Sequence, residues 1–171
     1  MLAIVNEVPL GHWKVQAGLG LRQAMLLNGI LYNSEAWHGV EKKDIILLEK
    51  VDEALLRGIL GAHSKIPVEA LFLETKAIPI RYVVASRRIL FLQTILKREE
   101  NEMIKRVYKA QKAQPSPGDF VNLVNEDSEL IGLDMTESEM TNISESQSHE
   151  CCIHLSSIIK AKSVKDGQSK I

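Results

Sequence analysis

The chain has 171 residues, of which 45% are hydrophobic and 25% charged, and its formal net charge is −1. This length and composition indicate one globular domain with a tail. Only 5% of the residues are aromatic and the apolar set is mostly Leu, Ile, Val and Ala. These proportions argue against a β-sandwich and favour helices packed on helices.

The first part of the chain is predicted to be irregular and then helical. Pro9 and Gly11 interrupt any long periodicity, so residues 1–17 are expected to be mostly coil. From Leu19 to Trp37 apolar residues fall on nearly every side, which predicts a helix surrounded by others, with Trp37 in the core.

The middle of the chain carries helix patterns with clear stop signals. Residues 42–60 form an amphipathic pattern that ends at Gly61, a residue suited to a left-handed C-terminal cap. Pro67 suits the first position of a short helix ending around Thr75 and Lys76. The apolar residues expected on one face of the 42–60 helix are Ile45, Leu48, Leu55 and Ile59.

Three further helices are predicted before the tail. Pro79 opens the helix "IRYVVASRRILFLQTILKR", and residues 99–114 continue as helix with Met103, Val107 and Tyr108 toward the core. Ser116 and Pro117 start another helix, which ends before Gly132. In "MTESEM", residues 135–140, Thr136 and Glu139 form a capping box, the clearest local helix start in the chain.

Together these patterns predict an all-α fold, an irregular bundle of about six helices. We expect one helical domain over residues 1–144 and a disordered or weakly helical tail over residues 145–171. No run approaches the ~20 apolar residues of a membrane-spanning helix. The opening "MLAIVNEVPLGHW" lacks the basic region of a signal peptide. An intracellular protein, cytoplasmic or nuclear, without a membrane partner is expected.

Charge is distributed unevenly along the chain. Residues 76–112 hold ten Lys or Arg and three Glu, a net of +7, whereas residues 119–150 hold nine acids and no Lys or Arg. The basic stretch could face phosphate. The candidates for a solvated surface that contacts a nucleic-acid backbone are Arg87, Lys97, Arg98, Lys105 and Arg106.

Two arginines of the Pro79 helix fall inside its apolar arc. Arg81 and Arg88 lie about 20° apart on a helical wheel, beside apolar residues. A buried arginine needs an acidic partner, so these two are expected to form structural ion pairs more readily than phosphate contacts. The candidate partners are Glu35, Asp52, Glu69 and Glu74.

No residue pattern predicts catalysis, a cofactor or a metal site. Cys151, Cys152 and His154 lack a spaced second pair of ligands, and adjacent cysteines are awkward for tetrahedral zinc. Adjacent cysteines also cannot staple a fold, which fits a reducing compartment. His63 and Ser64 are sequence neighbours, which seldom reach the geometry of a nucleophile and its base.

Four blocks in order carry a resemblance to a known family. They are "LLNGILYNSEAWHGV", "DIILLEKVDEALLRGILGAHSK", "IPVEALFLETKA" and "IPIRYVVASRRILFLQTIL". The chain resembles, over roughly residues 1–144, the region downstream of the catalytic palm in reverse transcriptases of non-LTR (LINE-type) retrotransposons. Beyond that point the family usually continues with a Lys-rich helical segment, whereas this chain continues "SESQSHECCIHLSSIIKAK".

The resemblance implies a thumb-like helical module that holds an RNA or RNA:DNA duplex by its backbone. The metal-binding aspartates of the family's palm have no counterpart here, so the chain is expected not to be an enzyme by itself. Its partners would be the duplex and a missing or separately encoded palm domain. The alternative is a non-catalytic helical protein-interaction module, or a decayed gene product without a selected function.

Overall fold

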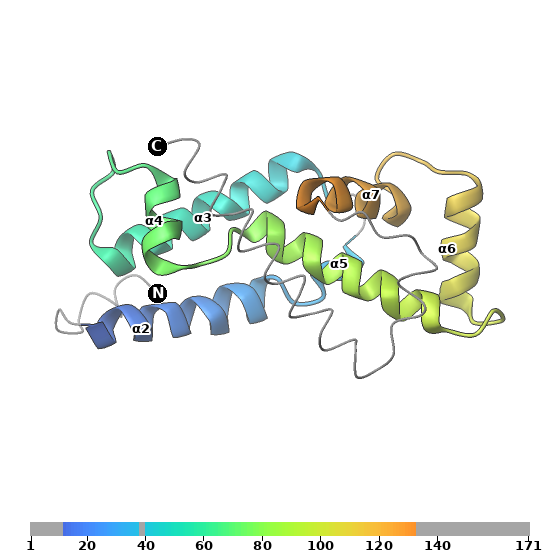
Figure 1. Ribbon diagram of the computed structural model, residues 1–171, viewed down its shortest axis with the longest axis horizontal. Helices are drawn as coiled ribbons and strands as arrows, with labels where there is room; N and C mark the ends of the chain where they lie inside the picture. Colours follow the sequence, from blue (N-terminus) through green and yellow to red (C-terminus); the bar gives the residue numbers. More distant parts are fainter. Residues whose placement is uncertain (1–11, 38–39, 133–171) are drawn as a thin grey trace. The chain divides into compact units, whose positions relative to one another are not determined.

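The computed structural model describes residues 12–37 and 40–132, and in these residues all regular structure is helical (Figure 1). The predicted all-α class is therefore confirmed. The described residues form two compact units where the sequence predicted a single domain. Unit 1 comprises residues 12–32 and 42–80, and unit 2 comprises residues 33–37, 40–41 and 81–132. The predicted capping box and the tail lie outside the described residues.

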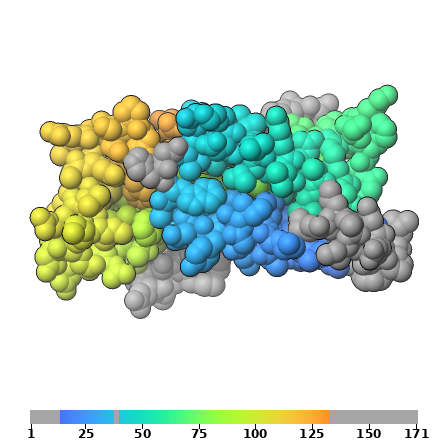
Figure 2. Space-filling model, turned by 180° about the vertical axis from the view of Figure 1, so that it is seen from behind, coloured from blue at the N-terminus to red at the C-terminus, as the bar shows by residue number. Residues whose placement is uncertain are grey.

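Unit 1 contains two long helical segments and one short helix. Helix α2 (His12–Leu21) runs directly into the π-helix η1 (Arg22–Ile30). Helix α3 (Lys42–Leu60) contacts α2, η1 and the short helix α4 (Val68–Thr75). Figure 2 shows the blue surface of α2 and η1 lying against the blue-green surface of α3.

The helices before Val40 differ from the prediction at both ends. In the described residues helix α2 begins at His12, although residues 12–17 were predicted to be mostly coil. The predicted continuous helix from Leu19 to Trp37 is interrupted. Asn33 adopts a left-handed conformation (φ 58°), and the short 3-10 helix η2 (Ser34–Ala36) follows it. Asparagine tolerates this conformation better than most residues.

The core of unit 1 consists of leucine and isoleucine side chains from facing helices. Buried members include Leu26 of η1, Leu55, Leu56 and Ile59 of α3, and Leu71 of α4. Ile45 and Leu48, predicted on the same face of α3, are only half-buried. The C-terminal half of α3 therefore supplies most of the buried surface of this helix.

Gly18 allows α2 to approach α3 closely, and replacing it with alanine is expected to destabilise unit 1. A Cβ atom at Gly18 would lie 2.7 Å from Cγ1 and 3.0 Å from Cγ2 of Ile59. Moving this buried side chain is expected to lower the free energy of unfolding by about 1–3 kcal/mol, measured by urea denaturation. Gly20→Ala is the matched control, because no heavy atom lies within 4 Å of its added Cβ.

The control should stabilise the chain by up to about 1 kcal/mol, since alanine favours helix over glycine. Equal effects of Gly18→Ala and Gly20→Ala would show that α2 and α3 are not in close contact at Gly18.

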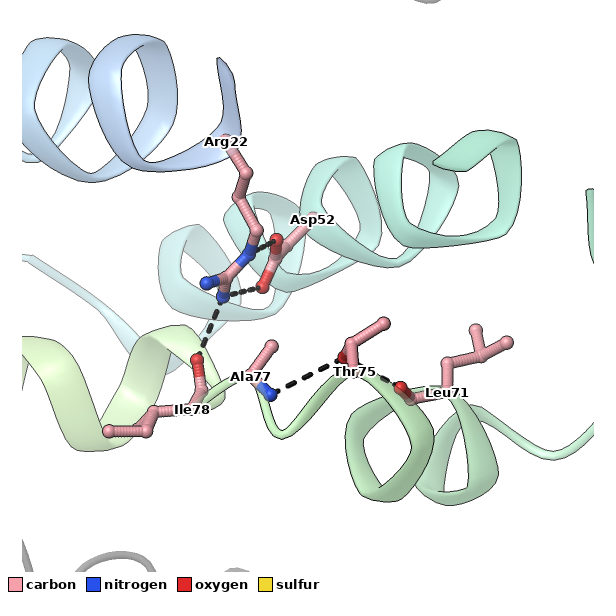
Figure 3. A network of polar contacts seen from close by, with 6 residues as sticks. All are labelled: Arg22, Asp52, Leu71, Thr75, Ala77 and Ile78. Atoms are coloured by element: carbon pink, nitrogen blue, oxygen red, sulfur yellow. Dashed lines mark hydrogen bonds and ion pairs between the residues drawn. The ribbon is translucent and has the colours of Figure 1, made fainter. Parts of the chain in front are cut away.

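A buried ion pair joins three segments of unit 1 (Figure 3). Arg22 Nε donates to Asp52 Oδ1 at 2.6 Å, and Arg22 Nη2 donates to Asp52 Oδ2 at 2.7 Å. The same Nη2 donates to the carbonyl oxygen of Ile78 at 2.8 Å. Asp52 is fully buried and Arg22 is 5% exposed. The pair therefore ties η1 to α3 and to the connection that precedes α5.

Two polar side chains shape the connections of unit 1. At the end of α4, Thr75 Oγ1 donates to the carbonyl of Leu71 and accepts from the N–H of Ala77, while Lys76 is left-handed (φ 54°). Arg57 donates to Glu53 and to the carbonyls of His63 and Ile66. The hydrogen bonds of Arg57 fix the turn after α3, where Gly61 has the left-handed conformation that its sequence position predicts.

Unit 2 contains three helices besides η2. They are α5 (Ile80–Lys97), whose first residue belongs to unit 1, α6 (Met103–Ala113) and α7 (Phe120–Ile131). Phe91 of α5 and Phe120 of α7 make an edge-to-face contact with ring centroids 5.7 Å apart. Helix α7 also contacts α6 and ends before Gly132, as predicted, and Gly132 adopts a left-handed conformation (φ 73°).

Helix α6 does not continue α5 and does not bury the residues that were predicted to be buried. Residues 98–102 form a turn, after which α6 runs across the end of α5 (Figure 1). Tyr108 is buried as predicted, but Met103 is 75% exposed and Val107 is 48% exposed. The prediction for Met103 and Val107 was wrong because α6 offers only a narrow face to its neighbours.

Candidate nucleic-acid interface

The candidate interface is the basic hairpin, which we define as residues 97–113: the last residue of α5, the following turn and α6. It carries three acids, all in the turn, and six basic residues. The basic residues are Lys97, Arg98, Lys105, Arg106, Lys109 and Lys112. Figure 2 shows the yellow surface of α6 beside the yellow-green end of α5.

The turn of the basic hairpin is built by local hydrogen bonds. The N–H of Glu102 donates to the carbonyl of Glu99 at 3.1 Å, and the N–H of Glu99 donates to Glu102 Oε1 at 3.3 Å. Glu102 is the residue before α6 and has an extended backbone, so the chain changes direction there. This turn places the end of α5 beside the first turns of α6.

Lys105 holds the two arms of the basic hairpin together. Its Nζ donates to the carbonyls of Leu96 and Arg98, each at 2.9 Å, and lies 3.1 Å from Glu100 Oε1. A cation at these carbonyls suits the C-terminal end of a helix, where backbone acceptors lack intrahelical partners. The side chain is 14% exposed. Lys105 therefore positions α6, and the prediction that it lies on a solvated surface was wrong.

Glu100 bridges two lysines of α6. It pairs with Lys105 and accepts a hydrogen bond from Nζ of Lys109. Hydrogen bonds from Lys109 and Lys105 lower the pKa of the Glu100 carboxyl, which stays ionised at neutral pH. Neither Glu100 nor Lys109 was predicted as a site residue. The signal for Lys109 was its position four residues after Lys105, which places both on one face of α6.

Three of the predicted backbone-contacting residues are exposed. Lys97 and Arg106 make no ion pair or hydrogen bond through their side chains with any residue in the described part of the chain. Arg98 is 55% exposed and lies 3.6 Å from Glu102, a loose surface pair. Arg87 differs, because it is half-buried and donates to Ser34 Oγ at 3.3 Å. The exposed members of the predicted set, Lys97, Arg98 and Arg106, therefore all lie in the basic hairpin.

Arg88 is buried in unit 2 and pairs with Asp127, which was not among its predicted partners. Its Nη1 lies 3.1 Å from Oδ2 of Asp127 in α7, and its Nε is buried without a hydrogen-bond partner. Burial raises the pKa of Asp127, and the charge of Arg88 offsets part of this shift. A single contact with one carboxylate oxygen is weaker than the two-point pair of Arg22 with Asp52.

The other residues proposed for structural ion pairs lie at the surface or partly so. Arg81 is exposed on the first turn of α5, and Glu69 is half-buried. Glu35 and Glu74 form no ion pair with the part of the chain that the structure describes. Asp52, the fourth candidate acid, pairs with Arg22. The choice of acidic partners for Arg88 was therefore wrong.

The described residues hold no group of three or more His, Cys, Asp or Glu side chains arranged for a metal ion. His63 Nδ1 accepts the N–H of Lys65 at 3.2 Å, a contact within the turn after α3. Cys151, Cys152 and His154 lie outside the described residues. No described helix has the length and apolar character of a membrane span.

The fold and the site define a helical protein with a basic hairpin at its surface. Comparison with known proteins adds no family to this description. No family model, no curated protein and no solved structure matches the chain.

Proposed function

We propose that the chain holds the sugar–phosphate backbone of an RNA or RNA:DNA duplex without reading its sequence. The observation that carries this proposal is the gathering of exposed cations in the basic hairpin, with Lys97 and Arg106 unpaired among the described residues. Phosphate contacts from such side chains position a duplex but carry no sequence information. The resemblance to the thumb region of retrotransposon reverse transcriptases supports the same role.

The arrangement of the basic hairpin suits contact with a backbone. Lys105 fixes α6 against the end of α5, so cations from two helices are held on one rigid element. Cations fixed in this way lose less conformational entropy on binding than those on an unstructured segment. Within this proposal the chain acts beside a polymerase palm domain, which supplies the catalytic residues.

Reversing charge at Lys97 and Arg106 is expected to weaken duplex binding. Lys97→Glu with Arg106→Glu should lower the affinity for a labelled RNA:DNA hybrid about tenfold or more at low salt, because two phosphate contacts become repulsive. The slope of log affinity against log salt should fall by about two. Fluorescence anisotropy over a salt series measures both quantities.

The matched control is Lys50→Glu with Lys65→Glu, which makes the same change in net charge at two exposed lysines of unit 1. Hybrids of unrelated sequence should bind the unsubstituted chain equally well. If the two double variants bind alike, or if no binding occurs at low salt, the basic hairpin is not a backbone-binding surface.

A second candidate function is protein interaction through α6. The observation in its favour is the exposed apolar stripe on this helix, formed by Met103, Ile104 and Val107. Sedimentation velocity distinguishes the candidates. Self-association that the charge reversals leave unchanged would favour this second role.

A further inference from the structure

Glu100 is an acid in the turn of the basic hairpin, and its carboxylate lies between two lysines of α6. Lys105 Nζ lies 3.1 Å from Oε1, and Lys109 Nζ donates to Oε2. The other two acids of the turn are Glu99 and Glu102, and neither pairs with a lysine in the part of the chain that the structure describes. The position between the two lysines is therefore filled by an anion that belongs to the chain itself.

The fold aims the N–H donors that meet at this position. An ammonium group has three N–H donors. Lys105 uses two of them on the carbonyls of Leu96 and Arg98. Its third donor remains for the carboxylate of Glu100. Lys109 has no acceptor other than Glu100 among the described residues. The two lysines therefore form a small anion site in the basic hairpin.

This anion site lies beside a cation without a partner among the described residues. Arg106 is three residues before Lys109, and side chains at this spacing are neighbours on a helix. It is exposed, and its side chain makes no ion pair or hydrogen bond with the described part of the chain. Phosphate oxygens accept hydrogen bonds from lysine as carboxylate oxygens do. A nucleic-acid strand in contact with Arg106 therefore has phosphates within reach of the site that Glu100 fills.

The contact between Glu100 and Lys109 is suited to exchange with another anion. Both side chains are more than half exposed, and exposed ion pairs add little stability. Lys105 keeps its bonds to two backbone carbonyls when Glu100 leaves, so the connection between α5 and α6 does not depend on the carboxylate.

We propose that Glu100 is an internal competitor of the nucleic-acid backbone. Its carboxylate fills the site at Lys105 and Lys109 in the free chain, and a backbone phosphate replaces it in the bound chain. This inference rests on the proposed function and adds a means by which the chain limits its own affinity. A strand gains these contacts only in molecules whose lysines are free, so the apparent affinity is reduced by that fraction.

Glu100→Gln tests the competition in the full chain. The affinity of this variant for a labelled RNA:DNA hybrid should rise about three- to tenfold at low salt, because more molecules have free lysines. Glu99→Gln is the matched control, since it removes the same charge from an exposed acid that pairs with neither lysine. It should raise the affinity less, through screened long-range electrostatics alone.

The sign of the change distinguishes competition from a bracing role. If Glu100 only braced the basic hairpin, its replacement would weaken binding. An unchanged or lower affinity of Glu100→Gln therefore overturns the proposal, and so do equal gains in Glu100→Gln and Glu99→Gln.

Lys109→Met locates the competition. In a chain that carries this substitution, Glu100→Gln should raise the hybrid affinity by a smaller factor than in the unsubstituted chain, because one of the two contested lysines is absent. A gain of the same size would place the effect of Glu100 outside its pair with Lys109 and contradict the proposal.

The carboxyl group of Glu100 reports the exchange directly. In the free chain, hydrogen bonds from Lys109 and Lys105 lower the pKa of this carboxyl. A phosphate that replaces the carboxylate takes these hydrogen bonds and adds negative charge nearby, so binding of the hybrid should raise the pKa. An NMR pH titration of the carboxyl carbon, with and without hybrid, measures this change. A pKa that stays lowered in the bound chain is the opposing result.

The results separate this proposal from the proposed function. Hybrid binding that falls with Lys97→Glu and Arg106→Glu, but does not rise with Glu100→Gln, retains the proposed function and overturns the competition. Absence of hybrid binding at low salt, in both the unsubstituted chain and Glu100→Gln, overturns both.

Discussion

Asp52→Ala is expected to lower the free energy of unfolding by about 3–5 kcal/mol, because it leaves the buried guanidinium of Arg22 without its charge partner. Arg22 makes two hydrogen bonds to Asp52, and only the bond to the Ile78 carbonyl remains in the variant. A loss of this size is a large part of the stability of a small domain. Urea denaturation followed by circular dichroism measures it.

Two further variants isolate the cause of this loss. Lys50→Ala lies on the same helix at an exposed position and should change stability by at most about 0.5 kcal/mol. Arg22→Met with Asp52→Leu removes both charges and should recover most of the stability, since apolar replacements of a buried pair are often neutral. A loss in the double variant as large as in Asp52→Ala would mean that the contacts themselves, and not the orphaned charge, stabilise unit 1.

Arg88→Met is expected to lower the free energy of unfolding by about 3 kcal/mol at neutral pH, because the carboxylate of Asp127 stays buried without a cation. Burial already raises the pKa of Asp127, and Arg88 opposes that shift. Because the pKa of this carboxyl is higher in the folded chain than in the unfolded chain, protonation of Asp127 stabilises the fold. The contribution is complete at pH values below the ordinary aspartate pKa. This contribution disappears as the pH rises through the raised pKa.

The deficit of Arg88→Met should therefore be largest at neutral pH and shrink as the pH falls through the raised pKa of Asp127, where the carboxylate takes up a proton. Denaturation at a series of pH values measures this trend. Arg87→Met is the neighbouring control and should cost less, because Arg87 is half-buried and its contact with Ser34 is long, at 3.3 Å. A deficit that does not vary with pH would rule out Asp127 as its source.

Helix positions followed from local signals where those signals were strong. The predicted helix over residues 42–60 has the observed bounds, and Gly61 follows it in the predicted left-handed conformation. Helix α7 ends before Gly132, as predicted. Proline, glycine and hydrophobic periodicity influence the backbone only within a few residues of their own positions. The local sequence is therefore sufficient to predict such a helix end. The left-handed Asn33 had a weaker signal, and the helix before it was predicted to be too long.

Burial was predicted less well because it depends on neighbours. Met103 and Val107 have the spacing of a core face, yet α6 leaves both exposed. The turn at residues 98–102, held by Lys105 and the Glu99–Glu102 hydrogen bonds, decides which face of α6 is covered. Nothing in the helical pattern of α6 alone specifies that turn.

The sequence by itself determined the helical class, most helix ends and the run of basic residues. The tertiary structure alone decided which acid meets which arginine. Asp52 and Arg22 are 30 residues apart, and Asp127 and Arg88 are 39 apart. Pairing over such separations depends on how the helices pack. Coulomb attraction is strong only over a few ångströms, so an arginine pairs with the acid that the packed backbone places beside it.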